Sequence, residues 1–151
     1  MSTGHGTPPP VGERWEEFMA DLEATAEEYR EAGYEVLAIH PGDVTPLPDD
    51  LALDVLAPGS EFEELEGLAE EFEVDEFAVY SAEDDGITFA LVVAKDESRE
   101  AAVCCPVFYH ETVATGLGAR AEEAGIVNIV VRPLSDDSQV VFTLEEPRLL
   151  F

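Results

Sequence analysis

The sequence predicts an α+β domain in which a mostly antiparallel sheet of about five to six strands packs against about three helices in two layers. Apolar residues make up 46% of the 151 residues, close to the globular norm, so the chain is able to bury a packed core. Apolar side chains recur at steps of three and four in some segments and alternate in others. Consecutive strand-like segments are joined by tight turns, which favours hairpins with the helices grouped on one face of the sheet.

Amphipathic helices are expected at about 13–32, 60–72 and 112–124. Gly33 and Gly125 follow the first and third segments, where a left-handed residue commonly ends a helix. Ser60 and Glu63 match the Ser-x-x-Glu pattern of a capping box, which predicts the start of the second helix. Helices therefore alternate with the strand segments along the chain.

Strands are expected at 34–40, 51–56, 77–82, 87–94, 101–109, 126–132 and 139–144, with a helical turn as the alternative for 51–56. Asp85-Gly86 lies between two β-rich runs and is a strong hairpin signal. Pro106 predicts a sheet edge or a bulge, because proline cannot donate to a ladder. Residues 41–50 hold three prolines and are expected to form a stiff surface loop.

The ends of the chain indicate its domain organisation and location. Residues 1–12 are rich in Gly, Pro and Thr and are expected to form a disordered N-terminal arm, with 13–151 as a single α+β domain. No apolar run approaches the ~20 residues that span a bilayer. The N-terminus has neither the basic nor the apolar region of a signal peptide. The expected location is therefore cytoplasmic.

The charge is the abnormal feature of the composition. Thirty-five Asp and Glu stand against seven Lys and Arg, which gives a formal net charge of −28. Self-repulsion at that charge destabilises the compact state, and salt relieves it, because the Debye length falls from about 10 Å at 0.1 M to about 3 Å at 1 M. The acid is scattered rather than gathered in one block, which favours adaptation to a salt-rich cytosol over a basic partner or nucleic-acid mimicry.

The same composition bounds the partners of the protein. Neither nucleic acid nor an anionic membrane is expected as a partner, because phosphate contacts need clusters of Lys and Arg that this sequence lacks. Acidic turns favour a loose, non-specific association with cations. The composition is compatible with a homo-oligomer and with a protein partner.

Three stretches resemble a family of uncharacterised acidic proteins from halophilic archaea. They are A-T-A-E-E-Y-R-E-A-G-Y-E-V-L-A-I-H-P-G-D-V at 24–44, L-D-V-L-A-P at 53–58 and F-T-L-E-E-P-R-L-L-F at 142–151. The resemblance covers nearly the whole chain after the arm and is most specific at the H-P-G-D-V turn. It implies a salt-rich cytosol and a domain of unknown function. It implies no activity and no catalytic residue.

The best candidates for chemistry are His40, Asp43 and His110. His40 and Asp43 flank a Pro-Gly turn after a strand, where a histidine and a carboxylate can act as a general acid–base pair. The alternative is structural, with Asp43 accepting hydrogen bonds from turn amides. His110 joins them only if the fold brings the two strand ends together. Cys104 and Cys105 point to opposite faces of a strand, so one is expected in the core and the other is free to be exposed.

No cofactor or dedicated metal site is expected. His5, His40 and His110 have no metal-ligand spacing. The segment 116–121 matches G-x-G-x-x-A, but it does not directly follow a strand and the helix after it is too short for a crossover, so the match is accidental.

Two hypotheses on function follow. The favoured one is a non-catalytic binding or interaction domain, with homodimerisation through an exposed sheet edge as one form of it. The alternative is a small acid–base enzyme, similar to a hydrolase, that uses His40 and Asp43 with His110.

Overall fold

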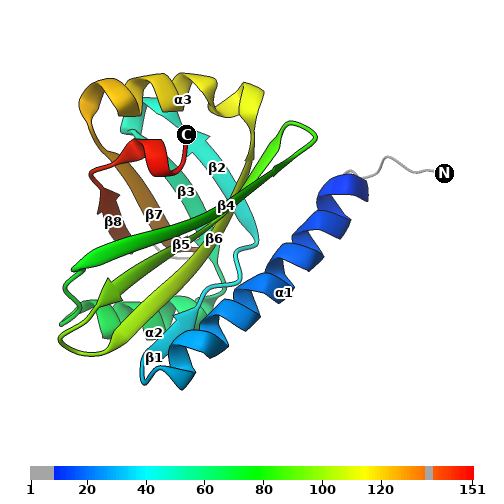
Figure 1. Cartoon of the computed structure of the whole chain (residues 1–151). Helices are drawn as coiled ribbons and strands as arrows, with labels where there is room; N and C mark the ends of the chain where they lie inside the picture. The colour runs from blue at the N-terminus through cyan, green and yellow to red at the C-terminus, as the bar shows by residue number, and fades with distance from the viewer. Residues whose placement is uncertain (1–8, 135–137) are drawn as a thin grey trace.

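A computed structural model describes residues 9–134 and 138–151 of the protein (Figure 1). Its elements in chain order are α1 (Pro9–Glu31), β1 (Glu35–Ala38), β2 (Asp43–Leu47), the 3-10 turn η1 (Pro48–Asp50), β3 (Ala52–Ala57), α2 (Gly59–Ala69), β4 (Glu76–Asp84), β5 (Ile87–Asp96), β6 (Ala101–His110), α3 (Glu111–Ala124), β7 (Val127–Pro133), β8 (Val140–Leu144) and the 3-10 turn η2 (Pro147–Leu149).

The eight strands form two mixed sheets of four, in the orders β1-β6-β5-β4 and β2-β3-β7-β8. The pairs β1–β6 and β3–β7 are parallel, and the other neighbours are antiparallel. The α+β class with three helices is confirmed, but the single, mostly antiparallel sheet of five to six strands is wrong. The parallel pairs join segments far apart in the chain, which local periodicity does not reveal.

The main core lies between the two sheets, and α2 and α3 each cover a different part of it. Leu65 of α2 and Leu117 of α3 are fully buried in this core, and the two helices lie at opposite ends of the sandwich (Figure 1). Helix α1 instead covers the outer face of the first sheet, where Leu22 packs with Val93 and Cys104. The helices are therefore not grouped on one face, and β5 and β6 are buried on both faces.

Strand β2 lies in the segment predicted to be a stiff loop. Pro46 is tolerated there because β2 is the terminal strand of its sheet and pairs only with β3 among the described strands, with Pro46 opposite Leu53. Pro106 lies inside β6, opposite Leu91, but past Cys104, the last residue that β1 pairs. No bond to β1 is lost there, so this proline needs no bulge.

Helix boundaries differ from the sequence pattern at two places. The capping box does not form: α2 begins directly after Pro58, and no side-chain bond caps its first turn. The backbone of α1 begins at Pro9, inside the predicted arm, while residues 1–8 lie outside the described residues. Strands β7 and β8 pair antiparallel, as expected for consecutive strands, and residues 135–137 between them also lie outside the described residues. No described helix is long and apolar enough to cross a membrane.

Candidate functional site

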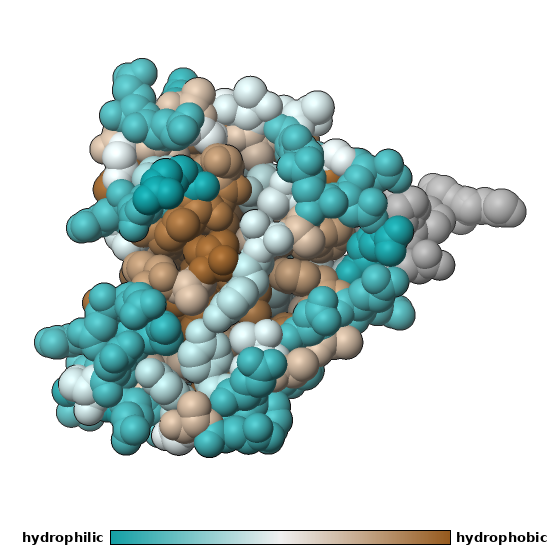
Figure 2. Space-filling view, viewed as in Figure 1, coloured by the Kyte–Doolittle hydropathy of each residue, from teal (hydrophilic) through white to brown (hydrophobic). Residues whose placement is uncertain are grey.

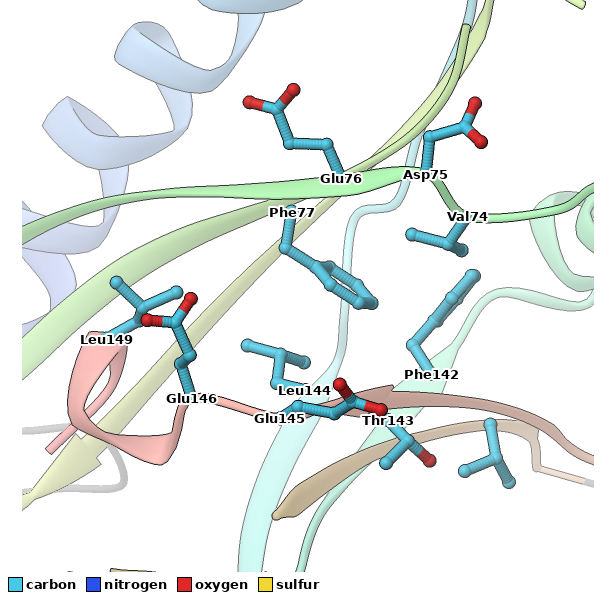
Figure 3. Close-up of a pocket in the computed structure, with 11 residues that line it drawn as sticks. Val74, Asp75, Glu76, Phe77, Phe142, Thr143, Leu144, Glu145, Glu146 and Leu149 are labelled. Carbon is cyan, nitrogen blue, oxygen red and sulfur yellow. The ribbon is translucent and has the colours of Figure 1, made fainter. Parts of the chain in front are cut away.

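The open side of the sandwich is where β4 and β8 face each other. Each is the terminal strand of its sheet, and within the described residues β4 pairs only with β5 and β8 only with β7. A cavity of about 450 Å³ lies between them, within the range of roughly 300–1,000 Å³ that ligand sites occupy. We call it the β4–β8 cleft. It is lined by Val74, Asp75, Glu76, Phe77, Val141, Phe142, Thr143, Leu144, Glu145, Glu146 and Leu149 (Figure 3).

The floor of the β4–β8 cleft is apolar. Phe77 points down from β4 while Phe142 and Leu144 point up from β8, because alternate residues of each strand face the core (Figure 3). Phe142 is held edge-to-face against Phe72, with ring centroids 6.4 Å apart. Figure 2 shows hydrophobic surface in a hollow beside β4, bordered by hydrophilic surface. The floor is therefore preformed, with Phe142 and Leu144 buried in the core and Phe77 half-buried.

The rim of the β4–β8 cleft is acidic, since Asp75, Glu76, Glu145 and Glu146 all line it. Lys95 lies 3.3 Å from Glu76, and Arg148 pairs with Glu146. Asp75 accepts a hydrogen bond of 2.7 Å from the backbone N–H of Glu97. The rim therefore holds four carboxylates, and the two cations Lys95 and Arg148 neutralise only part of their charge.

A second cleft of about 650 Å³ continues along the same strand. Ser81, Ala82 and Glu83 of β4 line it together with α3 and the C-terminal residues, and Leu149 of η2 lines both clefts. Phe151 also lines it, and the centroid of its ring lies 5.6 Å from that of the Tyr109 ring. The Tyr109 hydroxyl donates a hydrogen bond to the Leu150 carbonyl and fixes the segment after η2.

His40 lies away from both clefts and joins α1 to α2. Its Nδ1 is 2.7 Å from Glu61 Oε2, its Nε2 is 2.7 Å from Glu23 Oε2, and its backbone N–H donates to Glu61 Oε1 at 2.6 Å. Only the imidazolium can donate to both carboxylates at once. Partial burial acts to lower the pKa of His40, but the hydrogen bonds and charges of Glu23 and Glu61 outweigh it and raise the pKa above 6.5.

The stability of the fold should depend on pH through the bridge that His40 forms between Glu23 and Glu61. A raised folded-state pKa means that the stabilisation is fully present below about pH 6.5 and is lost as pH rises through the raised pKa of His40. The side chain is 44% exposed, so the contribution is about 0.2–1 kcal/mol. An NMR titration of the imidazole should give a pKa above 6.5, and Glu23→Gln should lower it. A pKa of His40 at or below 6.5 in the folded wild type would contradict the bridge.

The structure does not bring the three predicted acid–base residues together. Both ring nitrogens of His40 contact carboxylates, and it lies at the α2 end of the sandwich. His110 immediately precedes α3 at the opposite end, paired with Ile87 (Figure 1). The Asp43 carboxylate accepts a long hydrogen bond, 3.5 Å, from the Thr45 hydroxyl. Neither cleft is lined by any of these three residues.

The remaining motif candidates are structural. Cys104 and Cys105 are both buried, because α1 covers the face on which exposure was expected. Burial raises their pKa values to about 11 and about 12, so both thiols stay protonated. Gly116 and Gly118 lie inside α3 rather than in a strand-to-helix turn. No group of three or more metal-ligating side chains occurs in the described part of the chain, which does not include His5.

Sequence reasoning did not identify the site residues that the fold brings together. Phe77 and Phe142 follow ordinary strand patterns and meet only because two sheet edges converge. One signal was present: the uncharged run 77–82 is flanked on both sides by pairs of carboxylates. Glu23 and Glu61 carry no local signal that they contact His40.

Comparison with known proteins identifies a family but no activity. Residues 10–151 match the model of a family of unknown function (DUF7529). No curated protein and no solved structure matches the chain.

Proposed function

The chain belongs to that family of unknown function, and we propose from its geometry that it is a non-catalytic binding domain whose ligand docks in the β4–β8 cleft. One observation supports this most: a cavity with an apolar floor lies between two sheet edges that no described strand covers. Val74, which is 37% exposed, and the half-buried Phe77 and Leu149 would supply the apolar area that a ligand covers, since Phe142 and Leu144 are already buried in the core.

A binding role fits the residues better than acid–base catalysis does. Catalysis needs a titrating group within hydrogen-bond reach of a bound substrate. The β4–β8 cleft has carboxylates at its rim but no histidine in its lining, and His40 already contacts two carboxylates elsewhere. An apolar floor with a polar rim is the usual form of a binding surface.

The proposed setting is a salt-rich cytoplasm. A net charge of −28 with only seven basic residues supports adaptation to concentrated salt and argues against nucleic acid and anionic membranes as ligands. High salt also favours the burial of apolar surface when the salt ions are excluded from it. An apolar floor is therefore the kind of site that keeps its affinity in such a solvent.

A neutral apolar dye, Nile red, tests the binding role in molar KCl, where its fluorescence should rise on adding the protein. Val74 is 37% exposed and lines the β4–β8 cleft, so Val74→Glu should weaken dye binding by about three- to tenfold. Val113 is 58% exposed on α3 and lines neither cleft, so Val113→Glu should leave binding unchanged. No dye binding, or equal loss in both variants, would contradict the proposal.

A further inference from the structure

The free edge of β4 is unusually unprotected in its middle. Its nine residues pair only with β5 among the described strands, and residues 77–82 carry no charge. Natural proteins usually block such an edge with charged side chains, proline, a bulge or a covering segment. Here the charges stand only at the two ends, as Asp75 and Glu76 before the run and Glu83 and Asp84 after it.

We propose that the ligand is an extended peptide segment of a partner protein that pairs with the free edge of β4 as an added strand, with a basic residue at each end of an uncharged run. This inference rests on the proposed function and specifies its ligand. An added strand lies about 4.8 Å from its neighbour and gains main-chain hydrogen bonds along the edge.

The two clefts provide space for the side chains of the added strand. The β4–β8 cleft lies beside the start of β4 and the second cleft beside its end, with Leu149 lining both. Phe77 and Val79 face the inter-sheet core, so every second residue of the segment would also point toward the clefts. On the outer face, Tyr80 is 50% exposed and its hydroxyl lies 3.1 Å from that of Tyr29. Apolar residues are therefore preferred at the inward positions.

Charge selects the partner and disfavours a second copy of the chain. In the antiparallel register that pairs 77–82 with itself, Glu76 would face Glu83 and Asp75 would face Asp84, so only carboxylates meet. Lys95 contacts Glu76 and Arg14 contacts Asp84, and both cations belong to the same chain as their carboxylates. Basic residues at the ends of the partner segment would convert these repulsions into cross-strand ion pairs.

Salt limits this recognition to direct contacts. With a Debye length of about 3 Å at 1 M, the rim cannot steer a ligand from a distance. It still discriminates between groups that touch it, so charge sets the register of the segment while the apolar floor contributes most of the affinity. Discrimination by charge should therefore persist, reduced in size, in molar KCl.

The test uses a synthetic peptide, Lys-Thr-Val-Thr-Val-Thr-Val-Lys, whose valines lie opposite the inward-facing Phe77 and Val79 when it pairs antiparallel with 77–82. It carries a neutral fluorophore, and its binding is measured by fluorescence anisotropy in molar KCl. The same peptide with glutamate at both ends should bind about three- to tenfold more weakly. Glu83→Lys should weaken the lysine peptide about two- to fivefold and strengthen the glutamate peptide. Glu63→Lys, at an exposed position on α2, is the matched control and should change neither.

Equal binding of the two peptides, or an equal effect of both variants, would overturn the inference. If Nile red binds and the lysine peptide does not, the binding role stands and the peptide ligand is wrong. If Nile red does not bind, the proposed function itself fails. A concentration-dependent dimer in light scattering that Val79→Lys dissociates would assign the edge to a second copy and also overturn the inference.

Discussion

Dilution from molar KCl into low-salt buffer is expected to unfold the protein. Thirty-five acidic residues in a 151-residue chain repel one another strongly once the Debye length grows from about 3 Å at 1 M to about 10 Å at 0.1 M. The ion pairs do not offset this, because many join exposed side chains and such pairs contribute little. Far-UV circular dichroism during stepwise dilution should show a cooperative loss of structure that added KCl reverses.

Sucrose separates charge screening from a general exclusion effect. Sucrose stabilises compact states by exclusion from the protein surface but does not screen charge, so it should restore much less structure than KCl does. Full stability in dilute buffer would contradict our interpretation of the charge. The proposal of a salt-rich cytosol would then lose its main support.

Leu22→Ala should be among the most destabilising single substitutions outside the inter-sheet core. Leu22 is fully buried where α1 packs on the outer face of the first sheet, beside Val93 and Cys104. Removing a buried leucine side chain leaves a cavity and typically costs about 2–5 kcal/mol. Chemical denaturation in molar KCl gives the change in the free energy of unfolding. A large effect would show that α1 is an integral third layer.

Leu134→Ala makes the same chemical change at a position that is 79% exposed and serves as the control. It should change the free energy of unfolding by no more than about 0.5 kcal/mol. If Leu22→Ala cost as little, α1 would be a loosely attached helix. The burial of Cys104 by α1 would then be lost as well.

Local signals predicted those parts of the fold that local chemistry decides. The turn at Asp85-Gly86 does join β4 and β5, and both residues take the positive φ that such a turn requires. Gly125, at φ 80°, does end α3. The division into two sheets was not predictable in this way, because it depends on the parallel pairs β1–β6 and β3–β7. Pro46 also concealed β2, since proline at a sheet edge and proline in a loop look alike in sequence.

The candidate site was less predictable than the fold. His40 stood out in the sequence as a polar residue at a strand end, but its partners Glu23 and Glu61 come from two separate helices. The β4–β8 cleft needs two strands that are distant in sequence to end two different sheets on the same side. Periodicity marks Phe77 and Phe142 only as inward-facing residues, and it does not show that the space above them is open.

The most direct test of the β4–β8 cleft is a map of the backbone amides that respond to Nile red in a ¹H–¹⁵N NMR titration in molar KCl. Our account predicts that the largest shifts fall in 74–77, at and just before the start of β4, and in 141–146, at and just after the end of β8, with smaller changes near Leu149. Shifts centred instead on His40 and Asp43, or on the exposed surface of α1, would show that the ligand site lies elsewhere and would contradict the account.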